Sequence, residues 1–153
     1  MILYVCSYVV RTPFFSEKRI DLKEMGWEKL SNIIKNVFYF GGSVIIHKTD
    51  ADYSEEFERL AYSDIDSYSM VCDSRYGYLL GCSISENEEY PAGTYLRLVN
   101  RAAKNPDEIY IFEPHEDEWK AKYVNQDLEL SLKIFKDIYE YGELLFESKI
   151  MFE

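Results

Sequence analysis

Histidine is scarce in this chain, with two among 153 residues. A serine-type hydrolase needs an imidazole base, so only His47 and His115 are available for that role. No serine lies in a GxSxG sequence, and His47 follows an apolar run in which a structural histidine is the commoner case. His115 and Glu116 resemble the start of an HExxH zinc motif, but position 119 is Trp119 instead of a second histidine. We therefore expect no catalytic residue and no metal site.

Cysteine and glycine are also sparse, with three Cys and seven Gly. The odd cysteine count and the lack of a CxxC pair argue against a disulfide framework and favour a reducing compartment, so we expect a cytoplasmic protein. Cys72 and Cys82 could lie opposite each other on a hairpin and form a zinc site with His47, but buried thiols are the favoured interpretation. No GxGxxG or GxxxxGK[ST] sequence occurs, so no nucleotide cofactor is expected.

Long apolar runs and clustered basic residues are both missing. No run approaches the roughly 20 residues that a bilayer span needs, and the N-terminal MILYVCSYVVR lacks a signal peptide's basic start and cleavage site. Lys and Arg number 17 against 28 Asp and Glu, for a net charge of -11. Phosphate binding requires clustered cations, so neither nucleic acid nor an anionic membrane is expected as a partner.

The size and composition indicate one globular domain over residues 1–153. Hydrophobic residues make up 47% and charged residues 29% of the chain, which are ordinary values for a folded protein. No internal repeat or low-complexity tract divides it.

Hydrophobic periodicity predicts the elements of this domain. Apolar or alternating runs predict strands, and apolar spacings of three and four predict helices. Strands are expected over 2–10, 43–47, 94–99 and 108–112, with a hairpin over 68–84. Helices are expected over 22–38 and from Asp127 to Gly142, with a short one near Phe57 to Ala61, while the tail ELLFESKIMF fits either a strand or a helix.

Consecutive strands in the middle of the chain favour antiparallel pairing. We therefore expect an α+β fold in which two main helices pack on one face of a mostly antiparallel sheet of about five to six strands. The strand-helix-strand order at the start permits one parallel pair. A doubly wound parallel sheet is the weaker alternative, because only one helix clearly separates strands.

The negative charge is concentrated in the middle of the chain. Residues 50–118 contain 17 acidic and 5 basic residues, a net charge of -12. Such a run is often only a solvated surface, but it also steers a cationic partner. Eight tyrosines lie in this segment, and tyrosine is common in interface hot spots, although many tyrosines simply cover a core. The partner-binding residues expected from this pattern are Asp50, Asp52, Glu55, Glu56, Asp64, Asp66, Tyr68, Tyr76, Glu86, Glu88, Glu89, Tyr90, Glu116, Asp117 and Glu118.

A small, acidic, tyrosine-rich domain without catalytic motifs resembles the bacterial immunity proteins of contact-dependent growth inhibition and polymorphic toxin systems. The resemblance covers the whole chain as a profile, and no motif assigns it to one named family. It implies binding and inactivation of a cognate toxin domain, often a basic nuclease, without turnover. Two alternatives stay open: an acidic binding or scaffold module of another assembly, and a small enzyme that uses carboxylates in an aromatic cleft. The oligomeric state is left open.

Overall fold

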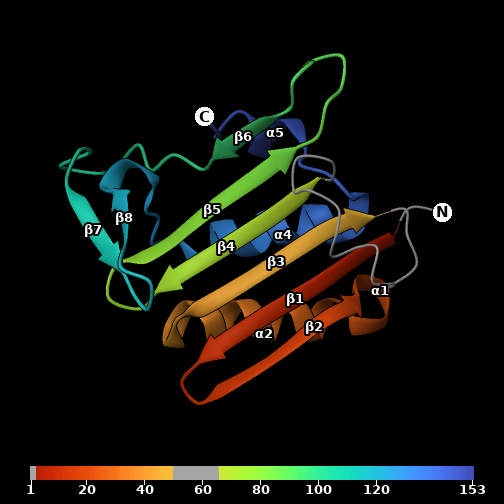
Figure 1. The fold of residues 1–153 in the computed structure, drawn as a ribbon, viewed down its shortest axis with the longest axis horizontal. Coiled ribbons are helices and arrows are strands. Elements are labelled where there is room, and N and C mark those ends of the chain that lie inside the picture. The colour runs from red at the N-terminus through yellow and green to blue at the C-terminus, as the bar shows by residue number, and fades with distance from the viewer. Residues whose placement is uncertain (1–2, 50–65) are drawn as a thin grey trace.

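Six strands form one antiparallel sheet in the computed structural model, which describes residues 3–49 and 66–153. The strand order across the sheet is β2-β1-β3-β4-β5-β6 (Figure 1). The strands are β1 (Leu3–Arg11), β2 (Phe14–Asp21), β3 (Gly42–Thr49), β4 (Ser67–Asp73), β5 (Gly77–Ile84) and β6 (Thr94–Arg97).

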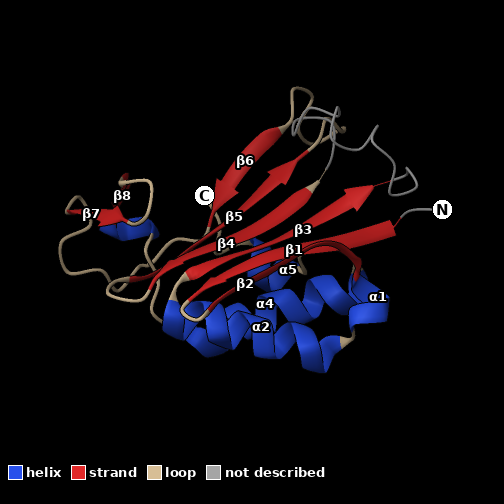
Figure 2. Ribbon diagram, turned by 60° about the horizontal axis from the view of Figure 1, so that its bottom comes forward, coloured by secondary structure: helices blue, strands red, loops and turns tan. Residues whose placement is uncertain are grey.

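Two long helices cover one face of this sheet, which we call the back face (Figure 2). They are α2 (Trp27–Phe40) and α4 (Leu128–Tyr141), and two single-turn helices, α1 (Leu22–Met25) and α5 (Phe146–Lys149), accompany them. The opposite face, toward the viewer in Figure 1, is called the front face. The expected α+β class, with two main helices on one face of an antiparallel sheet, is confirmed.

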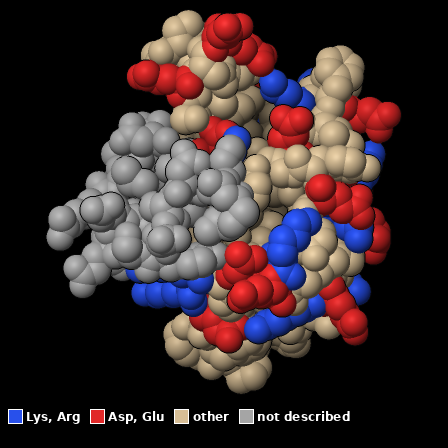
Figure 3. Space-filling model, turned by 90° about the vertical axis from the view of Figure 1, so that its right-hand side faces the viewer, with Lys and Arg blue, Asp and Glu red and all other residues tan. Residues whose placement is uncertain are grey.

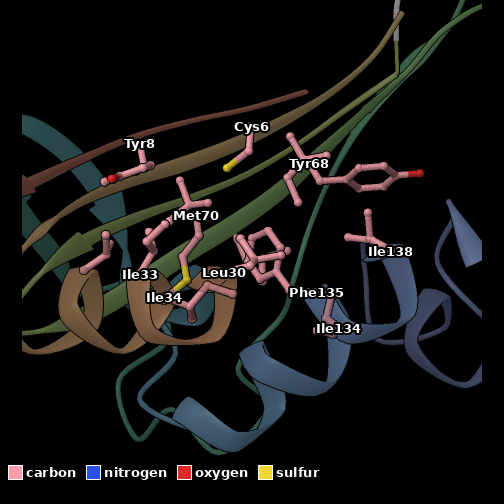
Figure 4. Packing of buried hydrophobic residues seen from close by; sticks show 14 of the residues in the cluster. Cys6, Tyr8, Leu30, Ile33, Ile34, Tyr68, Met70, Ile134, Phe135 and Ile138 are labelled. Atoms are coloured by element: carbon pink, nitrogen blue, oxygen red, sulfur yellow. The ribbon is translucent and has the colours of Figure 1, made fainter. Parts of the chain in front are cut away.

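The main core fills the space between the back face and the two long helices (Figure 4). Leu30 and Ile34 of α2, four residues apart, lie on one helix face, and Ile134 and Ile138 of α4 do the same, because a spacing of four returns to the same side of a helix. All four are fully buried. The strands contribute alternate residues, among them Cys6, Tyr8, Val44, Ile46, Met70 and Leu80. Buried side chains thus recur at every second residue of the strands and at spacings of three and four in the helices, and the two sets pack together in one layer.

The N-terminal half differs from the expectation at β2. Residues 14–21 form an edge strand that pairs with β1, and β1 in turn pairs antiparallel with β3, so the permitted parallel pair is wrong. The first five residues of this strand are all exposed, so none of them has to be apolar to face a core. The sequence FFSEKRID therefore lacks the alternation of apolar and polar residues by which a strand is predicted. The extra hairpin reverses the chain before the helices begin, and β3 therefore returns antiparallel.

The expected helix over 22–38 is two helices separated by Gly26. Asp21 caps α1 by accepting hydrogen bonds from the backbone N–H groups of Lys23 and Glu24, at 2.9 and 3.2 Å. Gly26 then adopts a φ of 79°, a conformation that other residues rarely take, and α2 starts afresh at Trp27. The helix expected between Asp127 and Gly142 is confirmed as α4, with Asp127 as its cap.

A second small sheet projects from one end of the main sheet. It is the hairpin of β7 (Ile109–Phe112) and β8 (Asp117–Lys120), followed by the 3-10 helix η2 (Ala121–Tyr123). The sequence predicts a strand over 108–112 and no strand between it and the helix at Asp127, so the strand β8, with the charged sequence DEWK, was missed. Phe112 and Val124 pack with Leu79 of β5 in a separate front-face cluster.

Asp73 joins this hairpin to the main sheet. Its buried carboxylate accepts a paired hydrogen bond from the Arg75 guanidinium, at 3.0 and 2.8 Å, and one from the backbone N–H of Glu113 at 3.1 Å. The Arg75 contact, together with the backbone donors, holds the pKa of the Asp73 carboxyl far below its usual range. One carboxylate thus links the β4–β5 turn to the β7–β8 turn.

Both edges of the main sheet are modified. On β2, Lys18 and Arg19 together oppose Ser7, and Arg19 has a φ of 57° while its N–H donates to the Ser7 hydroxyl at 3.1 Å. This extra residue is a β-bulge, which bends an edge strand.

On the other side of the sheet, the C-terminal tail pairs beside β6: the Glu153 and Arg97 backbones exchange two hydrogen bonds of 2.8 Å. The tail therefore contains both a helical turn and an extended end.

We predict that Asp73→Asn lowers the free energy of unfolding by about 2 kcal/mol at neutral pH, because the Arg75 pair loses its charge. The Asp73 contribution is complete above the unfolded-state pKa of about 4 and declines as pH falls below that value toward the depressed folded-state pKa. Urea unfolding of the parent and of the Asp73→Asn protein from pH 7 to pH 3 measures the difference in their free energies of unfolding. This difference should become smaller as the pH falls. Asp107→Asn, which breaks the exposed 3.5 Å pair with Lys120, should change little. If the Asp73→Asn protein were as stable at neutral pH as the parent, the stabilising role of the Asp73 carboxylate would be contradicted.

Candidate partner-binding surface

The loop between β5 and β6, residues 85–93, presents three of the expected acidic residues. Asn87 and Tyr90 close it locally: the Tyr90 N–H donates to the Asn87 side-chain oxygen at 2.8 Å, and the Asn87 N–H donates to the Tyr90 carbonyl at 3.0 Å. Glu86, Glu88 and Glu89 are all exposed on this turn, while Tyr90 is half-buried. The local closure gives the loop a defined shape and directs its carboxylates to solvent.

Asp66 fixes the base of this loop. Its Oδ1 accepts hydrogen bonds from the Ser85 N–H at 2.8 Å and from the Ser85 hydroxyl at 2.9 Å. Its Oδ2 lies 3.9 Å from the Lys48 Nζ. Asp66 thus serves mainly as an internal acceptor that ties the start of β4 to the end of β5.

Helix α5 lies against the same loop and adds apolar surface. The Lys149 Nζ lies 3.0 Å from the Glu89 carboxylate and 5.8 Å from the centre of the Tyr90 ring, and this contact lowers the Glu89 pKa. On the outer side of α5, Phe146 is 77% exposed and Ile150, one turn later, is 59% exposed. We define the loop–α5 surface as Glu86, Glu88, Glu89, Tyr90, Phe146 and Ile150.

A small pocket of about 140 Å³ lies behind this surface. It is lined in part by Lys48, Asp66, Asn87 and Glu143, so it joins the loop to the connection after α4. Charges of both signs line it, which suits a polar side chain better than an apolar one.

Acidic side chains gather at the top of this end of the molecule, where the β5–β6 loop lies, and alternate with basic ones lower down (Figure 3). Because the sheet is antiparallel, the end of β3 and the start of β4 lie at this same end. The connection between them, residues 50–65, is outside the described residues, and its sequence contains six acidic residues and one basic residue. Much of the chain's negative charge is therefore attached to one end of the sheet.

The remaining acidic cluster lies at the other end. Glu116, Asp117 and Glu118 are exposed at the β7–β8 turn, which joins the sheet near the β4–β5 turn (Figure 1). Tyr76 lies nearby, stacked on Tyr110 with ring centres 4.7 Å apart. The structure therefore does not bring this cluster together with Glu86, Glu88 and Glu89 on one acidic face.

Tyr68, which was expected to bind a partner, is a core residue. Its side chain is 6% exposed and packs in the main core, so it supports the sheet and offers almost no surface to a partner. Burial raises its pKa. The expected binding residues Asp50, Asp52, Glu55, Glu56 and Asp64 lie outside the described residues.

Sequence reasoning missed the apolar half of the loop–α5 surface. Phe146 and Ile150 belong to the tail ELLFESKIMF, which was expected to be either a strand or a helix, with no residue of it proposed to be exposed. The available signal was the spacing of four between them, with Glu147 and Lys149 in between, which is compatible with an exposed amphipathic turn. Their exposure depends on how α5 is placed, and a one-turn helix has no periodicity to reveal that.

The residues considered for chemistry are separated or buried. Cys72 pairs with Tyr78 and Cys82 with Tyr68 across the hairpin, so the two cysteines do not lie opposite each other. His47 is buried, which lowers its pKa, and His115 is exposed. Over residues 3–49 and 66–153, no three His, Cys, Asp or Glu side chains are grouped to hold a metal ion.

All three thiols are buried and free, which confirms the expectation for them. Burial raises the pKa of Cys6 and of Cys82 to about 12 and also raises that of Cys72. We predict that Ellman's reagent at pH 8 reacts with the native thiols at least about tenfold more slowly than with the guanidinium-unfolded chain, because only thiolates react. A fast-reacting native thiol would show an accessible, activated cysteine instead.

No family model matches the chain, and no curated protein matches it. A hypothetical protein from Neisseria gonorrhoeae, known from a crystal structure, has a similar fold. The TM-score is 0.61 at 7% sequence identity, and the similarity covers 95% of this chain and 90% of that one. This likeness concerns the fold alone. None of the described helices is long and apolar enough to cross a membrane.

Proposed function

We propose that the protein is an immunity protein that binds and neutralises a cognate toxin domain of basic charge, without catalysis. The observation that carries the proposal is the loop–α5 surface, where the Lys149–Glu89 pair joins a loop with three exposed carboxylates to a helix that exposes Phe146 and Ile150. Solvation alone accounts for the acids, but not for the two large apolar side chains that α5 exposes.

The two kinds of side chain have different tasks in such a complex. Carboxylates on a chain of net charge -11 attract a basic partner over a distance and raise the association rate. Aromatic and aliphatic anchors then slow dissociation once water is excluded from them. The Lys149–Glu89 pair, at 3.0 Å, keeps the two parts in fixed relation, so little ordering is required on binding.

The proposal is tested first by capture. The protein serves as bait in a lysate of its source organism, and the bound chain is identified by mass spectrometry. Support requires a basic toxin domain whose activity is abolished by an equimolar amount of this protein. A captured protein that stays active in the complex, or a turnover reaction by the chain itself, would favour the scaffold or the enzyme alternative.

We predict that Glu86→Gln, Glu88→Gln and Glu89→Gln together lower the association rate about tenfold at low salt and flatten its salt dependence, because steering is weakened. Stopped-flow binding from low to physiological ionic strength measures both effects. The matched control is Glu116→Gln, Asp117→Asn and Glu118→Gln, which removes the same charge at the other end of the sheet. Equal losses in the two variants would mean that net charge acts alone and that the loop makes no contact.

We predict that Phe146→Ala weakens binding about tenfold or more, mainly through faster dissociation, because the ring acts as an anchor. Surface plasmon resonance separates the two rates. Phe14→Ala is the control, since Phe14 is similarly exposed, at 72%, on a different part of the molecule. Unchanged dissociation of the Phe146→Ala variant would remove α5 from the interface.

A further inference from the structure

Arg97 lies on the front face of the sheet inside a set of aromatic rings. Its guanidinium carbon lies 4.6 Å from the ring centre of Tyr95, 5.6 Å from that of Tyr123 and 5.7 Å from that of Trp119. Tyr95 belongs to β6, Trp119 to β8 and Tyr123 to η2. Three elements therefore converge on one cation, and the contacts hold the guanidinium in place.

The hydrogen-bond donors of this guanidinium have no acceptor among the described residues. Its Nε is buried without a hydrogen-bond partner, and the side chain makes no ion pair within residues 3–49 and 66–153. Glu153, whose backbone pairs with that of Arg97, is exposed and makes no ion pair with it in this described part of the chain. A guanidinium has five N–H donors, and those on the two terminal nitrogens of Arg97 have no protein acceptor in the part of the chain that the structure describes.

The neighbouring strand is shaped to admit the cage. Gly81 lies directly opposite Arg97 on β5, and the Tyr95 ring lies over it so closely that a Cβ at Gly81 would fall 2.2 Å from the Tyr95 hydroxyl. Ser69 follows Gly81 across the sheet on β4. Small residues thus adjoin the cage, and Tyr95 is 42% exposed, so the site reaches solvent.

We propose that Arg97, with the rings of Tyr95, Trp119 and Tyr123, forms a carboxylate-binding site. A carboxylate is planar, like the guanidinium, and accepts two parallel N–H···O bonds from its edge. A phosphate dianion pairs with the same donors, but a chain of net charge -11 repels it more strongly than it repels a monocarboxylate. The net charge of -11 repels free anions, which favours a carboxylate carried by a larger molecule that is neutral or basic.

This site is independent of the loop–α5 surface and of the proposed function. It is tested on the whole protein by following the Trp119 indole N–H resonance during titration at constant ionic strength. Trp27→Phe identifies which of the two indole signals is Trp119. The probes are acetate, inorganic phosphate, and a short neutral peptide with one glutamate side chain. We expect saturable shifts with acetate and with the peptide.

The two carboxylate probes separate the possible sources. Tighter binding of the peptide than of acetate indicates a side chain of a protein partner, and equal binding indicates that a small carboxylate is sufficient. Phosphate binding tenfold tighter than acetate would overturn the carboxylate assignment. The absence of any saturable shift would overturn the site itself.

Variants test the role of the guanidinium. Arg97→Lys keeps the charge and the ring contacts but loses the paired donors, so carboxylate affinity should fall about tenfold. Arg97→Met should abolish the response, and Arg101→Met, which removes the same charge from an exposed residue nearby, should leave it unchanged. If Arg97→Met disturbs the β7–β8 hairpin, Arg97→Lys still tests whether the guanidinium donors bind the carboxylate. Unaltered affinity in Arg97→Lys would show that the paired donors are not used.

Discussion

Burial of one sheet face against α2 and α4 is the constraint on which the rest of the structure depends. Alternate strand residues such as Val44, Ile46 and Met70 are fully buried there, in the same cluster as the apolar residues of the two helices. At roughly 25 cal/mol for each Å² of apolar surface removed from water, this layer is the main favourable term in folding. The connections that lead into and out of α2 and α4 follow from it, because both helices must lie along the sheet.

The front face is held to its neighbours by a different kind of contact. It carries small or polar residues over much of its area, and the β7–β8 hairpin reaches it through Asp73 at one end and through the rings around Arg97 at the side. These are charge-assisted and cation–π contacts in place of a second extensive core. The hairpin cluster of Leu79, Phe112 and Val124 is small by comparison with the main core.

The sequence is informative wherever a pattern is local. The alternation of β4 and β5, the capped helix α4 and the antiparallel class follow from residue spacing and capping residues, because those signals arise within one element. The strands β2 and β8 could not be found in this way, since FFSEKRID and DEWK are largely exposed and are held by pairing with distant partners. The acidic loop 85–93 was identified from composition, but its neighbour α5 is brought to it only by tertiary packing, through Lys149 and Glu89. The core position of Tyr68 was likewise hidden, because a tyrosine in a strand reads the same whether it points inward or outward.

The bulge at Lys18 and Arg19 has a consequence for how this protein behaves at high concentration. A sheet whose edge strand offers an unbroken ladder of N–H and C=O groups can be extended by another copy, which is a route to fibrils. In β2 the ladder is interrupted midway by the extra residue and by two adjacent cationic side chains. At the opposite edge, the backbone groups of Arg97 are already paired with those of Glu153. Strand addition is therefore obstructed in the middle of β2 and at the Arg97 end of β6. An acidic protein that exposes Phe14, Phe146 and Ile150 to water thus has a protection against polymerisation that does not depend on repulsion between charges.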